Sequence, residues 1–148
     1  MDITVRRATP ADIDVLLPLV RAYRVFYGQM PDEAGERRFI GKHLREVTST
    51  VFLASDGRSV LGFVQIFESW STVRLAPMLI LEDLFVEPAV RGRGIARALI
   101  DAAIAYAREA GAGGMFLETA VNNERAQAVY ERSGWEREQT FVKFNAPL

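Results

Sequence analysis

Apolar residues recur along the chain in two patterns. In some segments they form short runs or alternate with polar residues, as in strands, and in others they recur at helical spacing. Short apolar or alternating runs predict β-strands over residues 3–7, 51–54, 60–67, 79–86, 115–120 and 138–144. Helical spacing predicts a helix that opens at Thr9–Pro10, helices over residues 33–46 and 123–132, and a helix that begins near Gly94. The order is strand, two helices, three strands, helix, strand, helix and strand, which predicts a mixed α/β fold.

The segment from Leu84 to Ala96, LFVEPAVRGRGIA, carries the clearest chemical signal in this pattern. Pro88 ends the apolar strand because proline has no N–H to donate to a ladder, and the helix follows. The first backbone N–H groups of a helix have no acceptor within the helix, and the helix dipole adds positive charge there. Gly92 and Gly94 let the main chain approach a ligand closely, and the neighbouring arginines add charge. We therefore expect this loop to hold a pyrophosphate.

Other interpretations of the loop are open at this point. An isolated Arg/Gly turn is usually only a solvated connection between a strand and a helix. A dinucleotide-binding fingerprint needs a third glycine where Arg97 stands, although Glu118 lies at about the right separation in the next predicted strand. The phosphate-binding motif of nucleotide hydrolases ends in Gly-Lys-Ser/Thr, which does not occur in this sequence, so the pattern disfavours nucleotide hydrolysis.

Two motifs together resemble one enzyme superfamily. Arg91-x-x-Gly94-x-Ala96, directly after LFVEP, resembles the acetyl-CoA pyrophosphate loop of the GNAT N-acetyltransferases. The segment NERAQAVYERSGW, from Asn123 to Trp135, resembles the N-x-x-A-x-x-x-Y-x-x-x-G-[FY] sequence of the same superfamily, with Trp in the last position. The resemblance covers essentially the whole chain, and YRVFYGQ near its start looks like a branch that acetylates small amines and some basic proteins.

This resemblance implies the fold, the cosubstrate and several contacts. The implied GNAT fold has a central, mostly antiparallel, twisted sheet that splays at the acetyl-CoA site and is flanked by about four helices. It implies a single acetyltransferase domain over residues 1–148 and, by resemblance alone, a homodimer. The residues implied to contact acetyl-CoA are Leu84, Phe85, Val86, Arg91, Gly92, Arg93, Gly94, Ile95, Ala96, Asn123, Ala126 and Tyr130.

Acetyl transfer to an amine requires a base, because a lysine-like amine is protonated at neutral pH. Removing its proton costs roughly 4.6 kcal/mol for a pKa near 10.4, unless the enzyme supplies a base or a desolvating pocket. By two-residue alternation Glu82 lies on the same strand face as Leu84 and Val86, so it is our first candidate base, directly or through water. Asp83 points to the opposite face and is the second candidate. Either carboxylate can instead serve only in a cap or salt bridge.

The departing CoA sulfur needs a proton, and the resemblance implies that Tyr130 stands at the general-acid position of the family. Its alternative role is aromatic packing under a C-terminal strand. Asn123 is placed to cap the last helix and, by resemblance, to face the CoA arm. Stabilisation of the oxyanion is expected from a backbone N–H at or near Leu84.

The acceptor side is expected where GNAT folds place a substrate-lining helix pair and loop. Aromatic faces with a few carboxylates suit a cationic amine, through cation–π contacts and charge pairing. The candidate lining residues are Tyr23, Phe26, Tyr27, Phe67, Glu68 and Trp70. Aromatic residues at these spacings are also typical of a core, and we expect His43 to be an ordinary exposed helix residue. The favoured acceptor is a small amine, polyamine or amino acid.

Two alternatives to a small-molecule acetyltransferase remain at this stage. One is transfer to a peptide or protein, at a lysine side chain or an N-terminus, since the same active site serves both in this superfamily. The other is a sensor domain that binds acetyl-CoA without turning it over. The presence of both Glu82 and Tyr130 favours an enzyme over a sensor.

Composition narrows the partners further. The 148 residues are 49% hydrophobic and 25% charged with a net charge of −1, so the overall charge favours neither nucleic acid nor a membrane surface as a partner. With no cysteine and one histidine, we expect no disulfide and no metal site. The N-terminal segment lacks an apolar leader run, and no apolar stretch approaches about 18 residues, so we expect a cytoplasmic protein.

Overall fold

A computed structural model describes residues 2–148, in a larger unit that ends at Glu118 and a smaller unit, Thr119–Leu148. The strands of the larger unit are β1 (Thr4–Arg7), β2 (Ser49–Ser55), β3 (Val60–Ser71), β4 (Ala76–Val86) and β5 (Gly114–Phe116). Its helices are α1 (Ile13–Phe26), α2 (Glu33–Glu46) and α3 (Ile95–Glu109), with short 3-10 turns at Pro10–Asp12 and Pro88–Val90. The smaller unit contains α4 (Glu124–Arg132).

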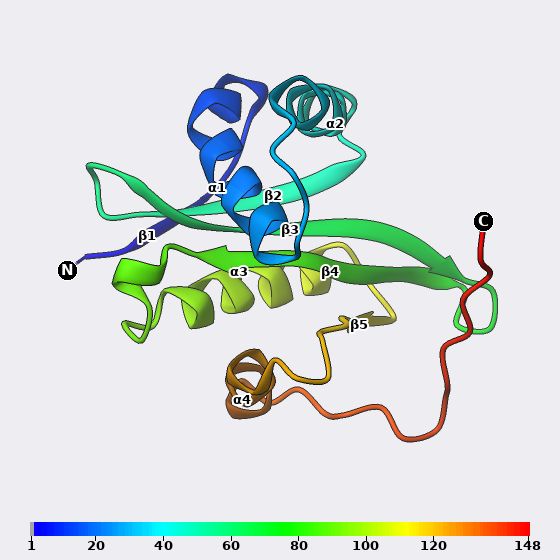
Figure 1. The fold of residues 1–148 in the computed structure, drawn as a ribbon. Helices are drawn as coiled ribbons and strands as arrows, with labels where there is room; N and C mark the ends of the chain where they lie inside the picture. The colour runs from blue at the N-terminus through cyan, green and yellow to red at the C-terminus, as the bar shows by residue number, and fades with distance from the viewer. Residues whose placement is uncertain (1) are drawn as a thin grey trace. The chain divides into compact units, whose positions relative to one another are not determined.

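The strands form one mixed sheet in the order β1-β2-β3-β4-β5. The first four strands pair antiparallel, whereas β5 runs parallel to β4. Helices α1 and α2 lie over one face of this sheet and α3 lies over the other (Figure 1). The sequence prediction of a mixed α/β sheet is therefore confirmed.

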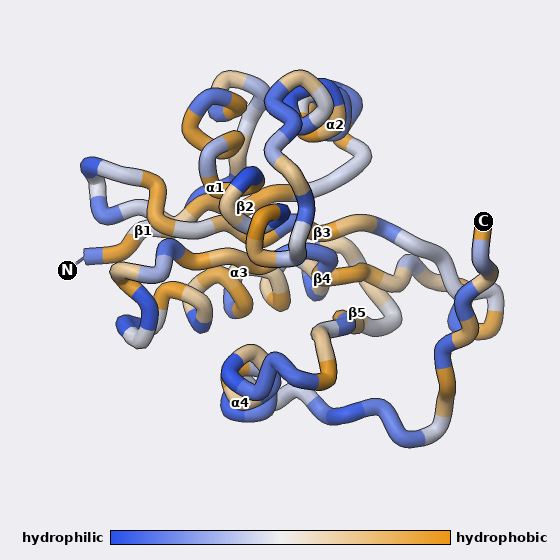
Figure 2. Tube along the Cα trace, in the orientation of Figure 1, coloured by the Kyte–Doolittle hydropathy of each residue, from blue (hydrophilic) through white to orange (hydrophobic). Residues whose placement is uncertain are grey.

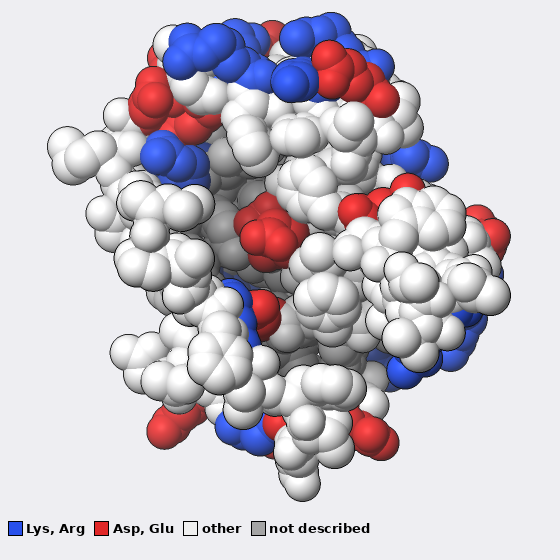
Figure 3. All heavy atoms as spheres, turned by 90° about the vertical axis from the view of Figure 1, so that its right-hand side faces the viewer, with Lys and Arg blue, Asp and Glu red and all other residues white. Residues whose placement is uncertain are grey.

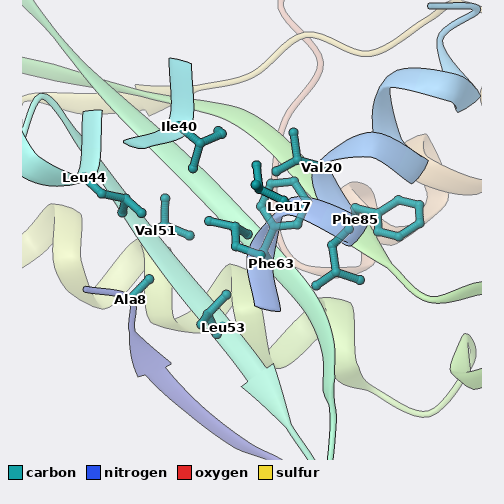
Figure 4. Close-up of a cluster of buried hydrophobic side chains, with 11 residues drawn as sticks. Ala8, Leu17, Val20, Ile40, Leu44, Val51, Leu53, Phe63 and Phe85 are labelled. Atoms are coloured by element: carbon teal, nitrogen blue, oxygen red, sulfur yellow. The ribbon is translucent and has the colours of Figure 1, made fainter. Parts of the chain in front are cut away.

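Each face of the sheet buries its own apolar layer. On the face of α1 and α2, side chains from both helices and from β2, β3 and β4 point toward one another (Figure 4). On the other face, α3 buries Ile95, Leu99, Ile100 and Ala103, which recur at helical spacing. Hydrophobic residues are concentrated along the central strands, whereas α2 carries mainly hydrophilic residues (Figure 2). The two-sided burial explains why β3 reads as a nearly continuous apolar run.

A buried ion network fastens α2 to α1. The Glu36 side chain is only 1% exposed, and its two oxygens accept from Arg21 Nε at 3.0 Å and Arg24 Nη1 at 2.7 Å. Burial disfavours the charged form of Glu36, but bonds from Arg24, from the Asp32 backbone N–H and from Arg21 outweigh burial and lower its pKa. Basic and acidic atoms adjoin across the end of the molecule where α1 and α2 lie (Figure 3).

The strand predicted over residues 138–144 is absent from the described chain. Glu138 Oε1 instead accepts from the backbone N–H groups of Thr140 at 2.6 Å and Phe141 at 3.1 Å, which holds a local turn. The apolar side chains of the segment stay exposed: Phe141, Val142 and Phe144. An alternating pattern predicts a strand only where a partner strand is available to complete the ladder. The strand predicted over residues 115–120 is also shorter, and ends at Phe116.

Candidate active site

A β-bulge in β4 sets the geometry of the two candidate carboxylates. Gln65 of β3 pairs with Asp83, but the next residue, Ile66, pairs with Leu81. Glu82 is therefore an extra residue in β4 with no partner of its own on β3. The two-residue alternation that made Glu82 our first candidate does not continue through a bulge, so that argument was wrong.

Asp83 lies half-buried on the face of the sheet that α1 covers. Gln65 Nε2 donates to Asp83 Oδ2 at 2.7 Å, and the Tyr23 hydroxyl lies within hydrogen-bonding reach of the same carboxylate. Burial raises the pKa of Asp83 above its ordinary value, and the charge of Glu82 adds to this rise, whereas the bonds from Gln65 and Tyr23 oppose it. Glu82 is exposed, and its backbone carbonyl accepts from the Tyr23 hydroxyl at 3.5 Å. Asp83 is thus the better shielded of the two carboxylates.

Gln65 is itself held from the neighbouring strand. Ser49 Oγ, at the start of β2, donates to Gln65 Oε1 at 2.9 Å. Both residues are buried, with Gln65 only 2% exposed. A chain of polar side chains therefore crosses the sheet from Ser49 on β2, through Gln65 on β3, to Asp83 on β4.

Of the predicted aromatic residues at the end of α1, Tyr23 reaches this carboxylate, and Tyr27 and Phe26 follow it ring to ring. The rings of Tyr23 and Tyr27 lie 5.1 Å apart between centroids, and those of Phe26 and Tyr27 lie 5.2 Å apart. The Tyr23 ring centroid also lies 6.0 Å from that of Phe63 and 6.3 Å from that of Phe85, so the end of α1 packs against the core. Phe26 and Tyr27 are exposed. The helix thus presents an accessible aromatic surface next to an acidic group.

The other predicted lining residues, on β3, lie in different surroundings. Phe67 belongs to a second aromatic group, in which the His43 ring centroid lies 5.0 Å from that of Phe67 and 4.5 Å from that of Phe39. His43 is half-buried, which corrects the expectation of an exposed helix residue. Glu68 is exposed, and Trp70 pairs with Pro77, roughly 16 Å along the strand from Gln65. Neither is brought to the Asp83 carboxylate.

The loop between β4 and α3 has the conformation that its glycines predict. Gly92 and Gly94 have φ angles of 79° and 82°, in the left-handed region that favours glycine. A Cβ added at either position would meet nothing within 4 Å, so the space beside the main chain is open. Gly94 is the N-cap of α3, and among the described residues no side chain bonds to the cap and no acidic residue occupies the first turn. The helix N-terminus is therefore available to an anion.

The two arginines of this loop differ in their surroundings. Arg91 Nε donates to the Val86 carbonyl at 2.8 Å, and its guanidinium lies 5.5 Å from the centre of the Phe85 ring. Arg93 is exposed on the loop. Arg91 thus fastens the loop to the end of β4, whereas the side chain of Arg93 is open to a ligand.

The end of β4 leaves one edge uncovered by strands. Among the described residues β5 pairs with β4 only from Met78 to Ile80, although β4 continues to Val86. Leu84 is half-buried on this stretch, while the side chains of Phe85 and Val86 are buried in the core. Any contact that Phe85 or Val86 makes with a ligand therefore runs through the backbone.

The predicted residues of the second motif lie in the smaller unit. Asn123 caps α4, because its side-chain Oδ1 accepts from the Ala126 N–H at 3.1 Å. Tyr130 lies on the same helix, and its ring centroid is 5.9 Å from that of Trp135. Trp135 also donates its backbone N–H to the Tyr130 carbonyl at 3.0 Å, which closes the helix end. The cap on Asn123 and the packing of Tyr130 are thus both present.

Sequence reasoning missed Gln65 and Ser49. A signal for Gln65 was present, because it is the one polar residue in the run VLGFVQIF. Ser49 carried no such signal, since a serine before a strand is common. Across the described residues, no group of three or more His, Asp or Glu side chains could hold a metal ion. In the same part of the chain, no helix is long and apolar enough to cross a membrane.

Comparison with known proteins places these features in one family. Residues 17–135 match the Acetyltransferase (GNAT) family. The uncharacterized N-acetyltransferase YhfO of Bacillus subtilis (strain 168) is 34% identical over 140 residues, which cover 95% of this chain and 94% of that protein. The aminoglycoside N(6')-acetyltransferase type 1 of Stenotrophomonas maltophilia is 30% identical over 150 residues, with coverages of 98% and 94%.

A solved structure supports the same family assignment. The crystal structure of a probable acetyltransferase matches with a TM-score of 0.93 and 36% sequence identity, over 98% of this chain and 97% of that one. The mixed sheet and the glycine loop thus match the fold of an acyltransferase. This chain belongs to the GNAT family, whose members are acetyl-CoA-dependent N-acetyltransferases.

Proposed function

We propose that this chain transfers the acetyl group of acetyl-CoA to a primary amine of a small molecule, by direct attack in a ternary complex. The observation that carries the proposal is the half-buried Asp83 carboxylate, which Gln65 holds beside the aromatic end of α1. Such a group both attracts a cationic amine and accepts its proton. We favour a polyamine, an aminoglycoside or an amino acid, because one relative is named an aminoglycoside N(6')-acetyltransferase.

Asp83 is proposed as the general base, in place of Glu82. When bound, acetyl-CoA supplies an activated acetyl thioester. Asp83 takes the proton that the amine loses as its nitrogen bonds to the acetyl carbon, and Tyr130 donates a proton to the sulfur as the carbon–sulfur bond breaks. A base with a raised pKa is the better proton acceptor, so burial of Asp83 favours this role. The exposed Glu82 is proposed to attract the cationic acceptor.

The chain's own residues fit acetyl-CoA. The open space beside Gly92 and Gly94 and the uncapped start of α3 suit a pyrophosphate, which the backbone N–H groups of Ile95 and Ala96 would bind. Arg93 would add charge to this site. The uncovered edge of β4 near Leu84 would hold the pantetheine arm and supply the oxyanion donor. We also propose Asn123 and Ala126 as contacts of the arm, from their place in the family motif.

The two units are proposed to act as one catalytic domain, since the family match runs from residue 17 to residue 135 and spans both. We further propose a cytoplasmic homodimer. The exposed apolar side chains of Phe141 and Phe144 support a contact between copies, since exposed aromatic residues of this size are enriched in interfaces.

Release of free thiol from acetyl-CoA, measured against a panel of amines, tests this proposal. The panel contains polyamines, amino acids, aminoglycosides and lysine peptides, and the variants are Asp83→Asn, Glu82→Gln and Tyr130→Phe. Turnover of one small-amine class, with loss of kcat but normal CoA binding in the Asp83 and Tyr130 variants, is the expected result. Turnover of lysine peptides alone would support a protein acceptor. CoA binding with no turnover would indicate a sensor, and absence of CoA binding would contradict the whole proposal.

A further inference from the structure

We propose that Gln65 and Ser49 are positioning residues, which hold the Asp83 carboxylate in one orientation toward the acceptor amine. The inference rests on the proposed function, in which Asp83 is the base. It concerns two residues that belong to neither family motif.

The direction of the hydrogen bonds follows from the chemistry of the groups. The Gln65 amide oxygen can only accept and its nitrogen can only donate, whereas an ionised carboxylate can only accept. Ser49 donates to Gln65 Oε1 at 2.9 Å, and Gln65 Nε2 donates to Asp83 Oδ2 at 2.7 Å. The opposite amide orientation would set an amide oxygen against the carboxylate. The carboxylate therefore determines which end of Gln65 faces Asp83, and the Ser49 hydroxyl, which can donate or accept, completes the arrangement by donating to Oε1.

The buried location of the hydrogen-bonded Ser49 and Gln65 argues against a purely structural role for them. Gln65 is 2% exposed and Ser49 is 6% exposed, and burying such groups is unfavourable unless they are hydrogen-bonded. Residues that flank Gln65 on the same face of β3, such as Phe63, are apolar and pack without polar partners. An apolar residue at position 65 would leave the Ser49 hydroxyl and the Asp83 carboxylate without this partner. What only a glutamine supplies here is a donor aimed at Asp83.

Two side chains from other elements hold the Asp83 carboxylate. Gln65 Nε2 donates to Oδ2, and the Tyr23 hydroxyl also bonds to the carboxylate. The titratable groups that face this carboxylate are Tyr23 from α1 and Glu82 from β4 itself, and the uncharged Gln65 faces it from β3. The Gln65 bond favours the ionised form, which counteracts the effect of burial. Losing that bond should raise the pKa of Asp83 further.

The test compares Gln65→Leu, Ser49→Ala and Ser49→Thr with the matched control Thr50→Val. Thr50 is as buried as Ser49 and also bonds to another side chain, that of Arg7, but has no link to Asp83. We expect the acidic limb of log kcat/KM to move to higher pH by about half a unit to one unit in Gln65→Leu, and less in Ser49→Ala. We expect kcat to fall about tenfold in Gln65→Leu. Ser49→Thr should keep the wild-type profile, and Thr50→Val should lower only thermal stability.

A second measurement keeps the test independent of turnover. The pKa of the Asp83 carboxyl is followed by ¹³C NMR titration in the wild type, in Ser49→Ala and in Gln65→Leu, and should rise in both variants. An unchanged pKa and an unchanged acidic limb in folded Ser49→Ala and Gln65→Leu would overturn the positioning role. If Asp83→Asn keeps full kcat while the NMR pKa still responds to Gln65, the proposed function fails and the hydrogen-bond chain stands.

Discussion

At the scale of single residues, Asp83, the proposed base, carries a cost to the stability of the fold. Its folded-state pKa is raised, so its favourable contribution to stability is complete below the unfolded-state pKa, near 3.9, and is lost as the pH rises through the folded-state pKa. At neutral pH the ionised, half-buried carboxylate therefore destabilises the folded state.

Asp83→Asn should accordingly lose activity and gain stability. We expect kcat to fall at least about a hundredfold, because an amide accepts no proton from the amine. The melting temperature at pH 7 should rise, because the amide oxygen still accepts from Gln65 without a buried charge, and the difference should vanish near pH 3. Steady-state kinetics and thermal melts at both pH values check this. A variant that is both fully active and less stable would contradict the assignment.

Gly94→Ala should weaken CoA binding without harming the fold in general. The left-handed conformation at φ 82° costs a residue with a Cβ roughly 1–2 kcal/mol, so we expect the Kd for CoA to rise about fivefold to thirtyfold. Gly111→Ala is the matched control, since Gly111 has a φ of 69°, equal open space and a place beyond the other end of α3. Calorimetric titration should show an altered Kd only for Gly94→Ala. Equal affinity in both variants would argue against the loop as the pyrophosphate site.

At the scale of elements, the α1–α2 pair depends on the buried carboxylate of Glu36. Removing one partner of a buried ion pair typically costs about 3–5 kcal/mol, and the partial exposure of Arg21 and Arg24 reduces this to about 2 kcal/mol. Glu36→Gln should therefore lower the free energy of unfolding by about that amount at pH 7. Because the pKa of Glu36 is lowered, the loss should shrink as the pH falls below 4.

Glu33→Gln is the control for this prediction. Glu33 lies on α2, as Glu36 does; its Oε2 is 3.9 Å from Arg21 Nη2, and its side chain is 70% exposed. An exposed pair of this kind contributes less than about 1 kcal/mol, so urea denaturation should barely distinguish this variant from the wild type. Equal losses in the two variants would show that burial of Glu36 is not what matters.

The pairing of β3 with β4 depends on a glycine. A Cβ at Gly62 would lie 2.7 Å from the Phe85 carbonyl oxygen and 3.3 Å from atoms of Leu99 and Val86. Gly62→Ala should therefore cost about 1–3 kcal/mol, by overpacking against a backbone that cannot move. Gly41→Ala in α2 should instead stabilise by about 0.5–1 kcal/mol, since its Cβ would meet only the flexible end of Arg45. Urea melts of both variants test the contrast, and destabilisation by both would contradict it.

At the scale of the whole molecule, the segment after α4 carries exposed aromatic residues, Phe141 at 80% and Phe144 at 90% exposure. If they form the proposed contact between copies, light scattering after gel filtration should give twice the chain mass for the wild type. The double substitution Phe141→Ser and Phe144→Ser should give the single chain mass. Val121→Ser, which removes an equally exposed apolar residue, should stay dimeric. A monomeric wild type would contradict the homodimer.

The sequence predicted correctly those helices and turns that are determined by residues close together in the chain. The helix predicted over residues 33–46 spans Glu33–Glu46, because Asp32 caps it through the Gly35 N–H at 3.0 Å. The Asp56–Gly57 turn joins two antiparallel strands as its residues predict. The final strand was predicted wrongly, because its formation depends on a pairing that no local pattern can guarantee. His43 was misplaced for the same reason, since Phe67 reaches it from β3.

The candidate site also has a part that the sequence predicted and a part that only the tertiary structure revealed. The amino-acid sequence alone predicted the conformation of the glycine loop, because left-handed glycines and a helix N-terminus are properties of neighbouring residues. Only the tertiary structure showed that Asp83 is half-buried and that Glu82 is exposed. A bulge interrupts the alternation between them, and Gln65 from β3 and Tyr23 from α1 reach Asp83 from distant parts of the chain. The environment of a carboxylate is set by what packs around it, and that packing exists only once the strands and helices have come together.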